Sequence, residues 1–187
     1  QMGFDVRGRQ NLEGQAQAIE AAAPDLVALQ EVSRGWTVNS SVDTVGWLSR
    51  RLNMPYVYAA FSGDLWGQAL LSRYPLVDVE AVPFPDNAGD VGEGLLAATV
   101  VAGEQRVRVI ASHFSAPIGG RSRERVEQIR LEQALMALEL WDEQSCSVDH
   151  GRPEQRDGQP ANPGDPGRWI HRSGRTARPR GVDLAQR

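Results

Sequence analysis

The chain has 187 residues, with a hydrophobic fraction of 41%, a charged fraction of 24% and a formal net charge of -4. These values are typical of a globular domain, and the acidic balance gives no indication of a generally basic, nucleic-acid-binding surface. No apolar run reaches membrane-spanning length and no signal peptide is recognisable. The single cysteine, Cys146, excludes an internal disulfide framework.

The first third of the chain predicts helices alternating with strands. Asn11 is a suitable N-cap for a first helix, and the apolar run over residues 25–32 predicts a buried strand after it. Asp43 can cap a second helix, and residues 56–60 predict a short strand. Helix followed by strand in this order indicates an α/β fold.

The strand over residues 25–32 ends on a carboxylate. Because side chains alternate along a strand, Val27, Leu29 and Glu31 are expected on one face. Glu31 then lies where an apolar strand meets a loop, which is where α/β proteins gather ligands. A carboxylate there can bind a hard cation such as Mg²⁺, although a Glu after a strand is more often simply solvated.

Three more strands are predicted between residues 76 and 114, with a two-residue turn at Gly103-Glu104 between the last two. His113 lies at the end of the last strand. A helix is predicted over residues 121–141, and its inward, apolar face is expected to comprise Val126, Ile129, Leu131, Ala134, Leu135, Leu138 and Leu140. A lone histidine at a strand end is most often structural, so its interpretation depends on the surrounding motifs.

Three motifs, taken in chain order, resemble the endonuclease/exonuclease/phosphatase superfamily, which includes the DNase I-like nucleases. They are Leu29-Gln30-Glu31-Val32, the segment Gly-Gln-Ala-Leu-Leu-Ser-Arg-Tyr-Pro at residues 67–75, and Ser112-His113-Phe114-Ser115. Each motif alone is weak, but their order and spacing together are specific. The resemblance covers about residues 1–141 and implies an α/β, DNase I-like mixed β-sandwich with flanking helices, of which this chain carries about the first half.

The resemblance also implies roles for four residues. Glu31 would be a catalytic residue and the ligand of Mg²⁺, with Mn²⁺ as a possible substitute, and His113 would assist at the scissile phosphate. Gln68, where the family commonly has Asn, and Arg34 are candidate substrate-binding residues. The implied partner is a phosphoester substrate, which in the family ranges from nucleic acids to phospholipid head groups and inositol phosphates.

Two family motifs are not identifiable: a strand ending in G-D-x-N, due soon after residue 141, and a terminal S-D-H. Asp149-His150 looks like part of the second motif but comes too early. Residues 145–187 are rich in Arg, Pro, Gly and Asp, which predicts a disordered or out-of-frame tail after a partial domain over residues 1–144. We therefore expect a truncated and catalytically impaired family hydrolase or, alternatively, a non-catalytic remnant or binding module on the same half-fold.

Overall fold

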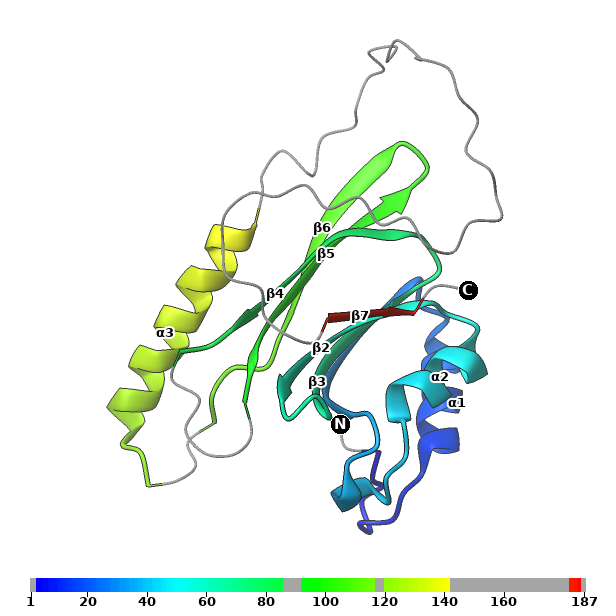
Figure 1. The fold of residues 1–187 in the computed structure, drawn as a ribbon, viewed down its shortest axis with the longest axis horizontal. Coiled ribbons are helices and arrows are strands. Elements are labelled where there is room, and N and C mark those ends of the chain that lie inside the picture. Colours follow the sequence, from blue (N-terminus) through cyan, green and yellow to red (C-terminus); the bar gives the residue numbers. More distant parts are fainter. Residues whose placement is uncertain (1–2, 86–91, 117–119, 142–181, 186–187) are drawn as a thin grey trace.

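The computed structural model describes residues 3–85, 92–116, 120–141 and 182–185, which form two β-sheets and three α-helices (Figure 1). The strand order is β1-β3-β2-β7 in the first sheet and β4-β5-β6 in the second, and all described pairings are antiparallel. The strands are β1 (Leu26–Ser33), β2 (Tyr56–Ser62), β3 (Trp66–Ser72), β4 (Leu76–Pro83), β5 (Gly94–Ala102), β6 (Gln105–Ser112) and β7 (Val182–Ala185). The helices are α1 (Leu12–Ala22), the short 3-10 helix η1 (Thr37–Asn39), α2 (Thr44–Leu52) and α3 (Arg123–Leu140).

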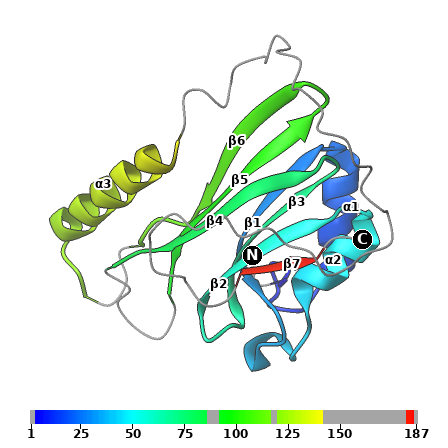
Figure 2. The same ribbon diagram turned by 45° about the horizontal axis from the view of Figure 1, so that its top comes forward.

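Helices α1 and α2 begin at the predicted caps. The side chains of Asn11 and Asp43 each accept a hydrogen bond of 2.9 Å from the backbone N–H three residues further on. Arg51 of α2 donates to Glu13 and Glu20 of α1 at 2.8 and 2.6 Å, and so joins the two helices. Both helices lie on one face of the first sheet (Figure 2).

The first sheet is buried on both of its faces because alternate residues point to opposite sides. Tyr58 and Leu71 face a core beneath α1 and α2, whereas Val57 and Leu70 face a second core between the two sheets. Leu96, Ala98 and Ala111 complete the second core from β5 and β6. Complete burial of one such Leu or Val side chain stabilises the fold by about 1.5–3 kcal/mol.

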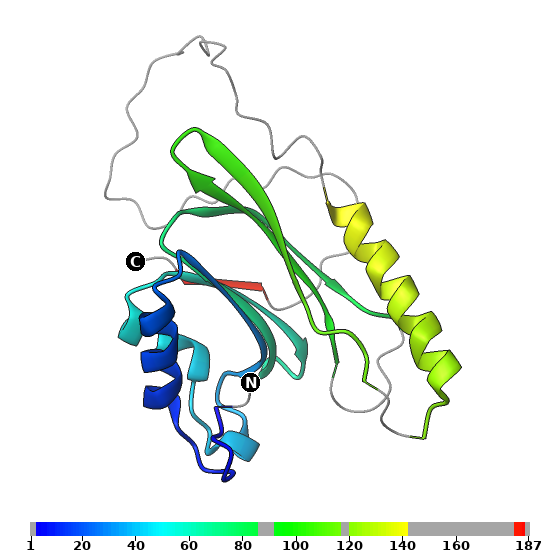
Figure 3. The same ribbon diagram turned by 180° about the vertical axis from the view of Figure 1, so that it is seen from behind.

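Helix α3 lies beside the second sheet, away from α1 and α2 (Figure 3). Of the apolar residues predicted to face inward, Val126 and Ile129 are buried. Leu131, Leu135 and Leu138, however, are 61%, 52% and 60% exposed, so this part of the prediction is wrong. The three leucines follow a helical spacing of their own on a second stripe, and periodicity alone does not decide which of two apolar stripes packs.

The structure contains one strand that the sequence did not predict. Strand β7 pairs with β2, with Tyr56 opposite Ala185 and Val57 opposite Leu184. It gives β2 a second hydrogen-bonded neighbour. The rest of the predicted tail, the predicted boundary at residues 144/145 and the loop at residues 86–91 lie outside the described residues. None of the described helices is both long and apolar enough to cross a membrane.

Candidate functional site

Strand β1 does not keep its alternation to the end. Leu29 pairs with Ala69 of β3 and Val32 with Gly67, so three steps along β1 match two along β3. Glu31 lies in this bulge with φ of 54°, a left-handed conformation that costs a non-glycine residue roughly 1–2 kcal/mol. Val32, not Glu31, packs with Leu29 in the core beneath the helices. The predicted shared face of Leu29 and Glu31 is therefore wrong, because the extra residue reverses the alternation.

Gly67 lies opposite the bulge, between two strands. It pairs with Val32 of β1 and Ala60 of β2. A Cβ atom here would overlap the carbonyl oxygen of Ala59 and would lie 2.8 Å from its carbonyl carbon. No side chain fits, so the glycine of the second motif serves to let three strands approach closely.

Gln68, predicted to bind substrate, is completely buried between the sheets. Its Nε2 donates to the carbonyl oxygen of Gly94 at 2.8 Å, which links β3 to β5. Its side chain also hydrogen-bonds to the carboxylate of Glu93. Its Oε1 is buried and has no hydrogen-bond partner among the described residues. The structure thus brings Gln68 to the neighbourhood of a carboxylate, while a role toward substrate stays a prediction.

The second sheet contributes a histidine and a glutamate. Leu95 of β5 pairs with Ser112 of β6, so Glu93 and His113, each just outside its strand, lie at the same end of the hairpin. His113 Nδ1 is 3.0 Å from Glu93 Oε1. The His113 side chain is 38% exposed and that of Glu93 is 18% exposed. The pair therefore lies at the border between the interior and solvent.

Helix α3 holds the segment that follows His113. The N–H of Ser115 donates to Gln133 Oε1 at 3.0 Å, and Gln133 Nε2 donates to Ser115 Oγ at 2.9 Å. Arg130 Nε also donates to the Ser115 carbonyl oxygen at 2.8 Å. These three bonds fix the chain two residues after His113 and limit the movement of the imidazole.

Three ionisable groups meet where the two sheets come together. Glu31, Glu93 and His113 each offer a ligand atom, and these atoms lie within 4.8 Å of one another. Glu31 and His113 thus approach each other, although they come from different sheets. We call this group the Glu-Glu-His cluster.

The electrostatics of the cluster favour a bound positive charge. Burial raises the pKa of the Glu93 carboxyl above its ordinary value. The hydrogen bond and charge of His113 and the hydrogen bond of Gln68 oppose this rise in pKa, while the negative charge of Glu31 adds to it. A cation between the two carboxylates would relieve both the repulsion and the loss of hydration.

Glu93 was not singled out as a site residue from the sequence, although a signal was present. The turn at Gly103-Glu104 pairs Ala102 with Gln105, and counting back along the hairpin places Gly94 opposite His113 and Glu93 opposite Phe114. The register of a hairpin is set by its turn, so counting finds that Glu93 and His113 share one end of the hairpin. Regular alternation would put their side chains on opposite faces, so counting does not find their contact.

Arg34, the other predicted substrate-binding residue, has contacts on the helix side of the first sheet. Its Nε is 3.9 Å from Asp43 Oδ1, and its guanidinium carbon is 5.4 Å from the centre of the Tyr58 ring. Tyr58 belongs to the core beneath α1 and α2, whereas the Glu-Glu-His cluster joins the two sheets. A role of Arg34 in substrate binding stays a prediction.

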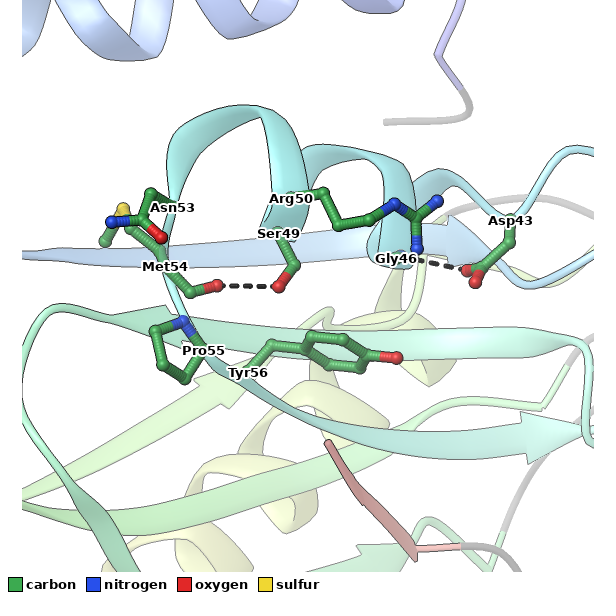
Figure 4. Close-up of a pocket in the computed structure, with 8 residues that line it drawn as sticks. All are labelled: Asp43, Gly46, Ser49, Arg50, Asn53, Met54, Pro55 and Tyr56. Atoms are coloured by element: carbon green, nitrogen blue, oxygen red, sulfur yellow. Dashed lines mark hydrogen bonds between the residues drawn. The ribbon is translucent and has the colours of Figure 1, made fainter. Parts of the chain in front are cut away.

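A pocket of about 450 Å³ lies between α2 and the beginning of β2 (Figure 4). It is lined by Asp43, Gly46, Ser49, Arg50 and residues 53–56. No residue of the Glu-Glu-His cluster lines it, so this pocket is separate from the candidate site.

Comparison with known families gives one match. The model of the Endonuclease/Exonuclease/phosphatase family matches residues 6–177. The match continues past Trp141, where the motifs recognised in the sequence end. No curated protein matches the chain.

Solved structures with the same fold share low sequence identity with this chain. A humanized TDP2 of D. rerio has a TM-score of 0.52 and 20% identity over 68% of this chain and 50% of that chain. D. rerio TDP2 complexed with a single strand DNA product has a TM-score of 0.51 and 21% identity over 68% and 47%. Sphingomyelinase C from Streptomyces griseocarneus has a TM-score of 0.50 and 18% identity over 70% and 53%. The chain thus spans about half the length of these proteins, and the predicted DNase I-like fold class is confirmed.

Proposed function

The chain belongs to the Endonuclease/Exonuclease/phosphatase family, and on that premise we propose that it is a metal-dependent phosphoesterase with its site at the Glu-Glu-His cluster. The observation that carries this proposal is the convergence of Glu31 and His113 from two different sheets. Glu31 is held there in a strained backbone conformation, and such strain gathers at functional sites.

The donor atoms fit a divalent cation. We propose that Glu31 holds Mg²⁺ or Mn²⁺ through a carboxylate oxygen, since these ions prefer oxygen ligands. The side chain of Gln68 hydrogen-bonds to the neighbouring Glu93, and its own Oε1 is buried without a hydrogen-bond partner in the described part of the chain. A cation bound here would act as a Lewis acid toward a phosphate oxygen.

His113 has a geometry that suits contact with a phosphate. Its Nδ1 faces Glu93, and a carboxylate in that position fixes the orientation of the imidazole ring. Nε2 has no partner among the described residues and would donate to a phosphate oxygen. Gln68 is completely buried, so it would act on substrate through Glu93 and not by direct contact.

The substrate class is the phosphoester group. One similar structure contains a single strand DNA product and another is a sphingomyelinase C, and both support a phosphoester substrate for this chain. Nucleic acids, phospholipid head groups and inositol phosphates all present this group, and Arg34 stays a candidate contact to it.

We also expect slow turnover by this polypeptide. Its sequence contains neither a G-D-x-N nor an S-D-H motif that we can identify, and loss of part of a catalytic unit lowers the rate by orders of magnitude. The alternative, a non-catalytic binding module on the same fold, rests on the same missing motifs.

Hydrolysis of bis(p-nitrophenyl) phosphate with Mg²⁺ or Mn²⁺ tests the proposal. We expect slow, cation-dependent turnover that Glu31→Ala and His113→Ala abolish and that Glu104→Ala, in the exposed hairpin turn, leaves unchanged. Turnover that persists in Glu31→Ala would overturn the site. A complete lack of cation-dependent turnover would favour the binding module, and rapid turnover would show that the chain is not impaired.

A further inference from the structure

The pocket between α2 and the beginning of β2 plays no part in the proposed function, because no residue of the Glu-Glu-His cluster lines it. Arg50 and Asp43 lie on its helix side, and the ring of Tyr56 lies on its strand side (Figure 4). Its volume of about 450 Å³ is within the range of about 300–1,000 Å³ that small-molecule sites occupy. The pocket is therefore large enough for a small organic ligand.

Arg50 brings an unused positive charge to this pocket. Its side chain is exposed and has no hydrogen bond or ion pair with any residue that the structure describes. The next residue, Arg51, differs, because it donates to both Glu13 and Glu20 and joins α2 to α1. A guanidinium presents five N–H donors in a planar fork that matches a carboxylate. Arg50 thus offers these donors to an anionic group of a ligand.

Asp43 brings a negative charge to the same pocket. Its Oδ1 accepts the N–H of Gly46 at 2.9 Å and lies 3.9 Å from Arg34 Nε. An ionised carboxylate has about four acceptor positions on its two oxygens, so these contacts leave positions for a further donor. Although Asp43 and Arg50 line one pocket, they form no ion pair with each other. The pocket therefore presents a cation and an anion that are separate from one another.

The strand side of the pocket is apolar and rigid. Met54, Pro55 and Tyr56 line it, and Met54 and Tyr56 belong to the core beneath α1 and α2. Tyr56 also pairs with Leu71 of β3 on one side and with Ala185 of β7 on the other. An aromatic ring that is fixed in this way favours contact with an apolar or aromatic group.

We propose that this pocket binds a free α-amino acid with an apolar side chain. The carboxylate of the ligand pairs with the Arg50 guanidinium, its ammonium group donates to the Asp43 carboxylate, and its side chain packs on the Tyr56 ring. A free amino acid carries both charges on one carbon atom, whereas a peptide terminus carries only one of them. Because the pocket is separate from the Glu-Glu-His cluster, this inference does not depend on phosphoester chemistry.

Titration of the full chain with four probes, followed by NMR of the backbone amides, tests the site. L-phenylalanine carries both charges and a ring, phenylalaninamide lacks the carboxylate, 3-phenylpropionate lacks the ammonium group, and glycine lacks the ring. We expect L-phenylalanine to shift the N–H signals of Gly46, Ser49 and Asn53 until they saturate. Each of the other three probes should have a dissociation constant at least about tenfold higher.

Two variants assign the charges to the two side chains. Arg50→Gln should weaken the binding of L-phenylalanine and 3-phenylpropionate by about tenfold and leave phenylalaninamide unchanged. Asp43→Asn keeps a side-chain oxygen that can cap α2, and it should weaken L-phenylalanine and phenylalaninamide but not 3-phenylpropionate. Arg123→Gln, on an exposed arginine of α3, is the matched control and should change none of the three constants.

Circular dichroism reports whether each variant is folded. Should Asp43→Asn not fold, the preference of the parent chain for L-phenylalanine over 3-phenylpropionate still tests the ammonium contact. A lack of saturable shifts up to about 20 mM L-phenylalanine would overturn the inference. Equal constants for L-phenylalanine and phenylalaninamide, or unchanged L-phenylalanine binding in Arg50→Gln, would also overturn it.

Discussion

The two sheets contribute to the Glu-Glu-His cluster in different ways. In the first sheet, Glu31 reaches the cluster through a bulge and a left-handed backbone. In the second sheet, Glu93 and His113 lie at the end of a hairpin whose register is regular from its turn to Leu95 and Ser112. The first sheet is packed on both faces, whereas α3 leaves a leucine stripe exposed beside the second. Among the three residues of the cluster, only Glu31 has a positive φ, so the backbone strain at the site comes from the first sheet.

The largest expected effect tests the packing around the bulge. Gly67→Ala should destabilise the fold by about 3 kcal/mol or more, because its Cβ would overlap backbone atoms of Ala59 that cannot move aside. Gly63→Ala is the matched control, since nothing lies within 4 Å of its Cβ, and it should cost only about 1 kcal/mol for its positive φ. Urea unfolding measures both, and equal losses would contradict the close approach of the strands.

The second-largest expected effect is the stabilisation of the fold by a bound cation, which requires residues of both sheets. At roughly 100 times its dissociation constant a divalent cation should stabilise the chain by about 2.7 kcal/mol, which raises Tm by about 5–10 °C. Glu31→Gln in the first sheet and Glu93→Gln in the second should each remove most of this gain. Glu80→Gln, on an exposed carboxylate paired with Arg108, should keep it. A gain that survives both cluster variants would place the ion elsewhere.

A smaller effect separates the strained backbone at Glu31 from the ordinary backbone at His113. Glu31→Gly should be more stable than Glu31→Ala by about 1 kcal/mol, because glycine adopts a positive φ without strain. At His113, whose φ is not positive, the Gly variant should be no more stable than the Ala variant. Thermal unfolding of the four variants without metal provides the comparison, and the same order at both positions would argue against strain at Glu31.

The smallest expected effect is a change in folding stability with pH in the absence of metal. Because burial raises the pKa of Glu93, the folded chain holds this proton more tightly than the unfolded chain. The contribution of Glu93 to stability should therefore fall as pH rises from the ordinary carboxyl pKa through the raised one, and then stay level. Glu93→Gln should remove this decline. A variant with the same slope as the parent in EDTA would contradict the raised pKa.

Sequence reasoning could predict the parts of the fold that local patterns control. Asn11 and Asp43 cap helices because the chemistry of a cap is local, and Glu31 and His113 were found because their motifs are short and ordered. The bulge could not be predicted, since alternation assumes a regular strand and only pairing with β3 reveals the extra residue. Strand β7 is four residues long and pairs with a distant segment, which leaves too little pattern to detect.

The most direct test of the central claim, that two sheets jointly form one cation site, is anomalous diffraction from crystals grown with Zn²⁺. We predict a single strong peak about 2.0–2.2 Å from carboxylate oxygens of Glu31 and Glu93, beside His113. A peak bound by the residues of only one sheet, or a chain whose only ions lie at His150 or His171, would contradict the claim.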